Sequence, residues 1–101
     1  MRMILFFDLP VDTVKARKEY TKFRKFLIKS GFMMMQESVY CKLVLNNTVA
    51  KSVADSIRNN KPSEGLIQLL IITEKQYSDM EFILGNYKGD IIDSDERFVE
   101  L

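Results

Sequence analysis

The stretch MILFFDLP, residues 3–10, decides how the rest of this chain can be arranged. Residues 3–7 are all apolar, which is typical of a strand buried on both faces of a sheet. Pro10 has no backbone N–H to donate to a neighbouring strand, so the strand is expected to end near Asp8. The stretch therefore predicts a buried strand with a carboxylate at its carboxyl end.

Asp8 has two interpretations at this position. Sheets of the α/β type often bind ligands at the carboxyl ends of their strands, which would make Asp8 a metal ligand. Aspartate is also common in the turn before a helix, and this stretch alone favours that second interpretation. The remainder of the sequence has to decide between them.

Length and composition predict one soluble domain over residues 1–101. The apolar share of the 101 residues is 47%, which is enough to build a core. No apolar run approaches the roughly 18 residues of a membrane span, and the first strand lacks the cleavage site of a signal peptide. The single cysteine, Cys41, cannot form an internal disulfide, so a cytoplasmic location is expected, with no membrane partner.

Charge is divided unevenly along the chain, although the net charge is only +1. Through Lys61 there are twelve Lys/Arg and five Asp/Glu, whereas from Pro62 onward there are three Lys/Arg and nine Asp/Glu. The basic first part predicts an anionic partner. The acidic second part indicates a protein partner or a solvated surface, and the solvated surface is the interpretation that its composition favours.

The absence of histidine and the single cysteine limit the chemistry open to this chain. A histidine general base, a Ser-His triad and a zinc site of several cysteines are excluded within one chain. Catalysis would have to rest on carboxylates, hydroxyls, Lys or Arg, or on a hard metal ion such as Mg²⁺.

A basic helix is predicted to begin near Asp12 or Thr13, either of which can cap it, and to end at Gly31. Spacings of three and four residues predict its buried face: Ala16, Tyr20, Phe23, Phe26 and Leu27. Its other faces carry seven Lys/Arg and a single acid, Glu19. Arg17 and Arg24 are seven residues apart, so they are expected to share one side of the apolar stripe.

Further strands and a second helix are expected beyond Gly31. Alternation over residues 33–45 predicts a strand kinked near Glu37, or two strands. Residues 50–57 predict a short amphipathic helix, residues 59–65 a loop, and residues 66–73 another strand buried on both faces. Residues 74–79 predict a turn or a short helix, residues 80–84 a strand, and residues 97–101 an edge strand outside the compact unit.

This order of elements predicts an α+β fold, a ferredoxin-like βαββαβ sandwich with one or more extra C-terminal strands. In such a fold, two helices cover one face of an antiparallel sheet. The other face would be left open, and a domain of this size is expected to cover it with a second copy of itself.

Several segments together carry a family resemblance. A strand ending in Phe7-Asp8 is followed by the basic helix, then by QESVY at residues 36–40 and LIITEKQ at residues 70–76. This combination resembles the second CRISPR-associated (Cas) protein family, the small partner of the spacer integrase, and is most similar to members from type II systems. The resemblance extends over essentially the whole chain.

The resemblance implies a ferredoxin-like homodimer whose two sheets face each other. In that family the strand-end aspartates of both subunits meet near the two-fold axis and hold a divalent metal, a role that falls to Asp8 here. Family members are described as metal-dependent endonucleases on single-stranded RNA or duplex DNA. They also form the central dimer of the spacer-acquisition complex, between two dimers of the integrase. The tail, Arg97, Phe98, Val99, Glu100 and Leu101, resembles the segment that docks onto the integrase.

Symmetry makes the implied metal site plausible chemically. A single Asp8 supplies one of about six oxygen ligands, but a two-fold axis brings in a second copy. Two Asp8 carboxylates, water and a scissile phosphate would then hold one Mg²⁺ or Mn²⁺ per dimer, which would polarise the phosphate and activate a water. No residue has the pattern of a dedicated general base. Ser38 and Tyr40 are candidate orienting groups, although either could equally pack within the sheet.

The basic helix predicts phosphate binding, because seven cations against one acid is unlike the mixed charge of an ordinary solvated face. The expected phosphate contacts are Arg17, Lys18, Lys22, Arg24 and Lys25. Binding is expected to be sequence-independent and salt-dependent. The alternatives are a Mg²⁺-dependent nuclease that acts alone, a toxin-like ribonuclease, or a small regulatory module of ferredoxin-like fold.

Overall fold

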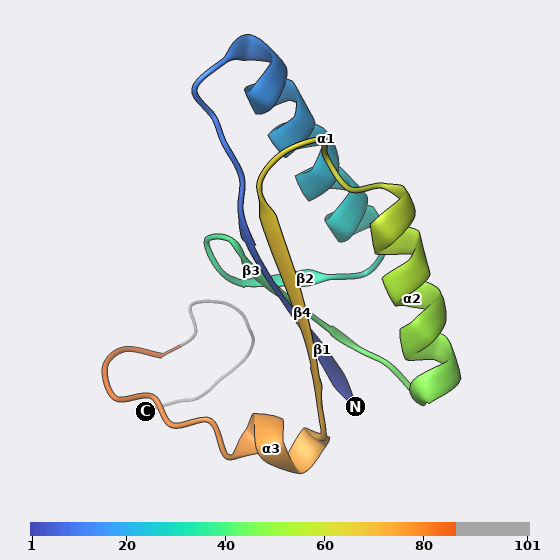
Figure 1. Ribbon diagram of the computed structural model, residues 1–101. Coiled ribbons are helices and arrows are strands. Elements are labelled where there is room, and N and C mark those ends of the chain that lie inside the picture. The colour runs from blue at the N-terminus through green and yellow to red at the C-terminus, as the bar shows by residue number, and fades with distance from the viewer. Residues whose placement is uncertain (87–101) are drawn as a thin grey trace.

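The computed structural model describes residues 1–86 (Figure 1). Its elements, in chain order, are β1 (Arg2–Asp8), α1 (Val14–Lys29), β2 (Met33–Gln36), β3 (Val39–Leu43), α2 (Asn47–Asn59), β4 (Leu66–Ile72) and α3 (Glu74–Ser78). Within this range, the structure contains no helix with the length and apolar character of a membrane span.

The four strands form one antiparallel sheet in the order β2-β3-β1-β4. β1 therefore lies in the middle of the sheet, as its apolar run predicts. Phe6 of β1 is opposite Val39 of β3 on one side and Gln68 of β4 on the other. The βαββαβ order with this strand arrangement is ferredoxin-like, so the predicted fold class is confirmed.

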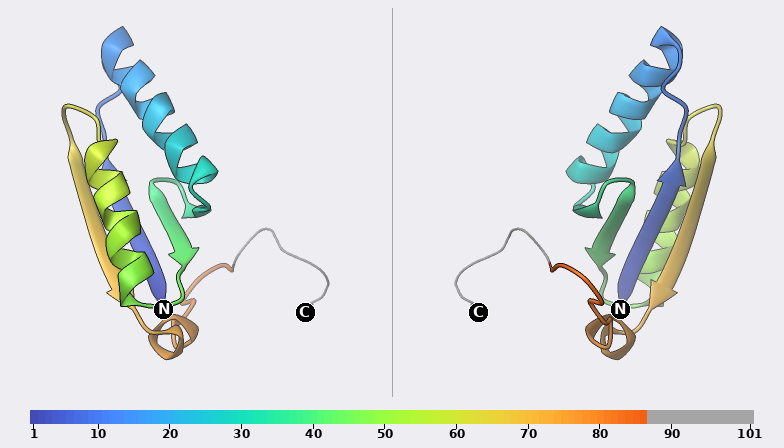
Figure 2. Two further views of the ribbon diagram at one scale, coloured as in Figure 1. Left: turned by 90° about the vertical axis from the view of Figure 1, so that its right-hand side faces the viewer. Right: turned by 90° about the vertical axis from the view of Figure 1, so that its left-hand side faces the viewer.

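The two long helices cover one face of the sheet (Figure 2). Met3, Leu5 and Phe7 alternate along β1 and are buried against this helical layer, with Phe23 and Leu27 of α1 fully buried in the same core. α1 begins where Thr13 accepts a hydrogen bond from the Ala16 amide at 3.0 Å. After α1, Gly31 has φ of +95°, the left-handed conformation that ends many helices.

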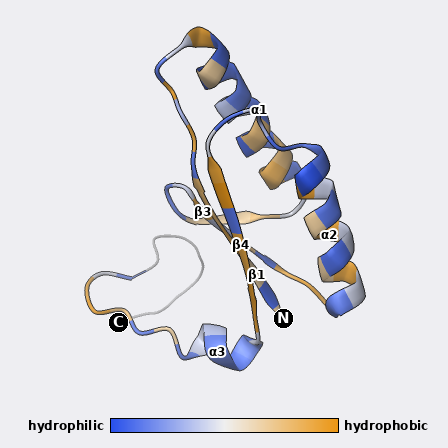
Figure 3. Cartoon of the chain, viewed as in Figure 1, coloured by the Kyte–Doolittle hydropathy of each residue, from blue (hydrophilic) through white to orange (hydrophobic). Residues whose placement is uncertain are grey.

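The opposite face of the sheet, which we call the open face, carries apolar side chains that the helices do not cover. Figure 2 shows this face with the strands in front of the helices, and Figure 3 shows that β4 is mostly hydrophobic. Phe6 is 38% exposed, Leu43 58% and Leu70 51%. Alternation of side chains places these residues on the face opposite Met3 and Leu5.

Residues 33–45 contain two paired strands joined by a turn at Glu37 and Ser38, which confirms the second of the two alternatives for this segment. Two other expectations need correction. The side chains of β4 are not buried on both faces, because the helices cover only one face of the sheet and leave residues such as Leu70 exposed on the other. Residues 80–84 form no strand, since they follow α3 without a pairing partner within residues 1–86. The short helix expected in residues 74–79 is confirmed as α3, and the expected strand at residues 97–101 lies outside the described residues.

Candidate nucleic-acid interface and carboxylate site

Asp8 is the last residue of β1 and is exposed. Its position in the alternation places it on the open face with Phe6. β4 is adjacent on one side, where Asp8 is opposite Leu66. The β2–β3 hairpin is adjacent on the other side, where the Phe7 amide donates to the Ser38 carbonyl at 3.0 Å. The carboxylate is therefore fixed to a rigid part of the sheet at one end of an apolar surface.

Gly65 supports the backbone at Asp8. Its φ is +111°, and a Cβ on it would lie 2.9 Å from the Asp8 carbonyl oxygen and 2.6 Å from a methyl carbon of Leu9. Only glycine avoids both the strained conformation and these contacts. Gly65 falls within residues 59–65, for which a loop is expected, and a glycine directly before an apolar strand is a signal for close backbone approach.

Asp8 does not form a metal site within one chain. No group of three or more His, Cys, Asp or Glu side chains that could hold a metal ion is found in residues 1–86. Mg²⁺ prefers about six oxygen ligands, so the donor set fits a metal only as one half of a symmetric site.

The two candidate orienting residues have other positions in the fold. Tyr40 is 1% exposed and packs on the helix-covered face, opposite the face that carries Asp8, so it cannot orient that carboxylate. Ser38 has φ of +67° in the hairpin turn, and its carbonyl accepts from Phe7. Within residues 1–86, no hydrogen bond joins either hydroxyl to Asp8. Neither side chain therefore orients the Asp8 carboxylate of its own chain by a hydrogen bond.

The predicted phosphate contacts all lie on α1 and are all exposed. Four of them line one open depression with Val14 and Thr21: Arg17, Lys18, Lys22 and Lys25. Arg24 lies at the margin of this set, toward the sheet. Figure 1 shows that α1 begins beyond the carboxyl end of β1 and runs back along the sheet.

The single acid of α1, Glu19, forms hydrogen bonds with the loop before β4. Glu19 accepts from the Ser63 amide at 2.9 Å and from the Ser63 hydroxyl at 2.8 Å. The amide and then the hydroxyl of Ser63 lower the pKa of Glu19, and the charges of Lys15 and Lys22 lower it further. Glu19 therefore stays ionised and engaged with the loop, which leaves the outer face of α1 strongly positive.

Both arginines on the shared side of α1 are held by hydrogen bonds. Arg17 Nη1 donates to the Val11 carbonyl at 3.0 Å, and Arg24 Nε donates to the Tyr40 hydroxyl at 3.1 Å. Arg17 thus contacts the loop before α1, whereas Arg24 contacts β3. No local sequence pattern indicates that Tyr40 is the partner of Arg24, because the two residues belong to different elements.

Residues 1–80 match the family model described as CRISPR associated protein Cas2. The chain belongs to this family. A Cas2 relative from Treponema denticola, named CRISPR-associated endoribonuclease Cas2, is 56% identical over 101 residues, which is all of both chains. A relative of the same name from Streptococcus mutans is 48% identical over all of this chain and 93% of its own length.

The Cas2 fold is also supported by a solved structure. The crystal structure of Streptococcus pyogenes Cas2 at pH 6.5 superposes with a TM-score of 0.64 at 17% identity. The match covers 84% of this chain and 100% of the other. At this identity the likeness concerns the fold, and it agrees with the ferredoxin-like sheet and helices described above.

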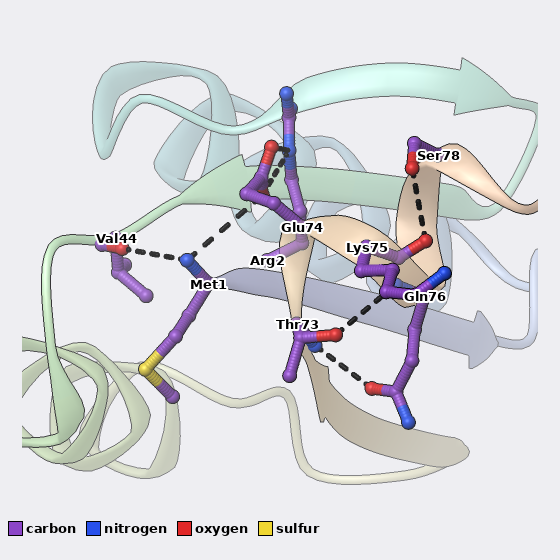
Figure 4. Close-up of polar contacts among 8 residues, drawn as sticks. All are labelled: Met1, Arg2, Val44, Thr73, Glu74, Lys75, Gln76 and Ser78. Atoms are coloured by element: carbon purple, nitrogen blue, oxygen red, sulfur yellow. Dashed lines mark hydrogen bonds and ion pairs between the residues drawn. The ribbon is translucent and has the colours of Figure 1, made fainter.

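In this Cas2 chain, α3 is attached to the end of β1 that is far from Asp8 (Figure 4). Thr73 and Gln76 form a reciprocal capping box, and Arg2 Nε donates to both Glu74 oxygens at 2.9 and 3.2 Å. The Arg2 guanidinium also lies 4.2 Å from the centre of the Tyr77 ring. Partial burial lowers the pKa of Arg2, but the hydrogen bond and charge of Glu74 raise it more, so the pKa is above its ordinary value. This attachment fixes where the chain leaves the sheet after β4.

Proposed function

We propose that this Cas2-family chain works in CRISPR adaptation as a central homodimer that binds duplex DNA and bridges integrase dimers. The observation that carries the proposal is the outer face of α1. Its cations are exposed, and its only acid is engaged with Ser63. A surface of one charge sign without interspersed acids is suited to a phosphate backbone.

The open face supports the dimer. A contiguous apolar surface on a sheet is typical of a protein interface, and a second copy placed on it by a two-fold axis would be self-complementary. Asp8 belongs to this face, so the axis would bring two Asp8 carboxylates toward each other. The basic helices, on the opposite side of each sheet, would then face outward from the dimer.

Duplex binding is expected to follow charge and to ignore base sequence. Each cation that neutralises a phosphate adds about 0.9 to the slope of log affinity against log salt concentration. Lys18→Gln with Lys22→Gln should weaken binding and reduce that slope by roughly one unit for each phosphate contact removed. Fluorescence anisotropy over a salt series measures this, with Lys51→Gln on α2 as the control. An unchanged slope in the α1 variant would contradict the assignment of this surface.

A symmetric pair of Asp8 carboxylates would hold one Mg²⁺ or Mn²⁺ per dimer, and the ion would supply polarisation of a phosphate and a more acidic bound water. The carboxylates bind and orient the ion, while α1 holds the nucleic acid. The relatives' name, CRISPR-associated endoribonuclease, supports phosphodiester cleavage of RNA, and we propose single-stranded RNA and duplex DNA as the substrates. No residue of the chain is assigned as a general base, so cleavage is expected to be slow.

Asp8 and α1 have separable roles in this proposal. Asp8→Ala should abolish metal-dependent cleavage by the pure protein and leave spacer acquisition in cells intact. Arg17→Glu with Lys18→Glu should abolish acquisition. Loss of acquisition in an Asp8→Ala dimer that remains folded would overturn the architectural proposal. It would favour instead the second candidate, a Mg²⁺-dependent nuclease whose cleavage is itself the function.

The integrase contact is assigned to Arg97, Phe98, Val99, Glu100 and Leu101, which lie outside the described residues. Removal of residues 97–101 should prevent co-purification with the integrase on a short duplex with frayed ends. Duplex binding by the truncated Cas2 chain alone should be unchanged. Retained co-purification would show that the contact lies elsewhere.

A further inference from the structure

Tyr40 holds the guanidinium of Arg24 through one of its three nitrogens. Arg24 Nε donates to the Tyr40 hydroxyl at 3.1 Å. Within residues 1–86, no acidic side chain forms an ion pair with Arg24. The residue is exposed, so the edge of the guanidinium that carries Nη1 and Nη2 remains available to a ligand. That edge has the fork geometry that matches two oxygens of a phosphate.

The Tyr40 ring is itself immobile. Its side chain is 1% exposed, and the ring stacks on Phe7 with centroids 5.6 Å apart at 24°. Phe7 is in turn packed edge-on against Tyr20 and Phe23, with centroids 6.0 and 5.8 Å apart. A side chain enclosed in such a cluster has one rotamer, so its hydroxyl is a fixed anchor.

The lysines among the predicted phosphate contacts differ from Arg24 in this respect. Within residues 1–86, the structure gives no hydrogen bond or ion pair to Lys18, Lys22 or Lys25. Lysine is a point charge on a flexible stem, so these residues contribute to the field without a defined geometry. Arg17 is the parallel case to Arg24, because the Val11 carbonyl holds its Nη1.

We infer that Arg24 is a pre-oriented, bidentate contact to a nucleic-acid phosphate and that Tyr40 is the positioning residue that fixes it. This inference rests on the proposed binding of duplex DNA by α1 and adds a geometric requirement to it. The alternative is that Arg24 only satisfies the buried Tyr40 hydroxyl. The two roles predict different DNA affinities for variants that remove the Tyr40 hydroxyl or the Arg24 guanidinium without changing the net charge.

Tyr40→Phe and Arg24→Lys both keep the net charge of the chain. If Tyr40 orients Arg24, each variant should weaken binding of a duplex DNA probe by about 3- to 10-fold, the cost of ordering a side chain that is no longer held in place. The salt slope should stay unchanged, because no charge is lost. In the double variant, Tyr40→Phe should add nothing to the loss caused by Arg24→Lys, since both changes act through one contact.

Two controls separate this effect from damage to the fold. Tyr20→Phe removes a hydroxyl from the same aromatic cluster and keeps the hydrogen bond between Tyr40 and Arg24, and Arg58→Lys makes the same arginine change on α2. Both should bind as the unsubstituted protein does. Thermal unfolding of each variant reports any loss of stability independently of DNA.

The outcomes distinguish the inference from the proposed function. If the unsubstituted protein fails to bind duplex DNA, the proposed function is wrong and the inference falls with it. If it binds and Tyr40→Phe binds equally well, the inference alone is wrong. The inference would also be wrong if the double variant lost affinity by the product of the two single losses. Tyr40 would then affect binding through the fold and not through Arg24.

Discussion

At the scale of single residues, Gly65 controls the position of Asp8. Gly65→Ala should destabilise the protein by roughly 2 kcal/mol or more, because a left-handed alanine is strained and its Cβ would meet the Asp8 carbonyl oxygen. Chemical denaturation measures the change. Gly85→Ala is the matched control: φ is +77° there, but a Cβ would meet nothing within 4 Å. Equal losses of unfolding free energy in the two variants would mean that backbone strain, and not close approach to Asp8, accounts for the requirement for glycine at position 65.

Glu19 gives a residue-scale prediction that depends on pH. Because its pKa is lowered in the folded chain, ionised Glu19 stabilises the loop at neutral pH, and this contribution is lost as the pH falls through the folded pKa. The amide resonance of Ser63 in an NMR titration should therefore move with a midpoint below 4.5, the ordinary value. In Glu19→Ala this transition should be missing, whereas Glu64→Ala in the same loop should keep it. A midpoint at or above 4.5 would contradict the lowered pKa.

At the scale of elements, the sequence predicted those helix features that apolar periodicity and capping residues determine. The apolar spacing of α1, the Thr13 cap and Gly31 each act locally, so both ends of that helix could be predicted. The sequence did not decide between one kinked strand and a hairpin of β2 and β3. The turn of this hairpin has Ser38 in a left-handed conformation, where glycine or asparagine is the usual signal. The edge position of β4 depends on strand order, which an apolar run alone does not determine.

Only part of the candidate site could be predicted, because some of its contacts join residues that are far apart in the sequence. Asp8 and the cations of α1 could be selected by residue type and position along one element. The contacts of Arg24 with Tyr40 and of Gly65 with Asp8 join residues that are distant in sequence, and no local pattern encodes them. The attachment of Arg2 to Glu74, 72 residues later, is of the same kind.

At the scale of the whole molecule, the open face predicts dimer formation. Leu70→Glu would place a charge on this face, opposite Ile4, where a buried interface would leave it desolvated. We expect the variant to be a monomer by light scattering after gel filtration, with unchanged circular dichroism. Leu45→Glu is the control, because Leu45 is 89% exposed and follows β3 outside the sheet. A Leu70→Glu protein that remains a dimer would exclude the open face as the interface.

The outer edge of β4 also affects solubility. β4 reads LIQLLII, with no charge and no proline, and within residues 1–86 no strand pairs with its outer side. Segments of this composition with a free edge act as templates on which other chains add strands. Concentrated or freshly synthesised protein is therefore expected to aggregate through residues 66–72. This hazard is greatest before folding is complete, when the same segment lacks even its pairing with β1.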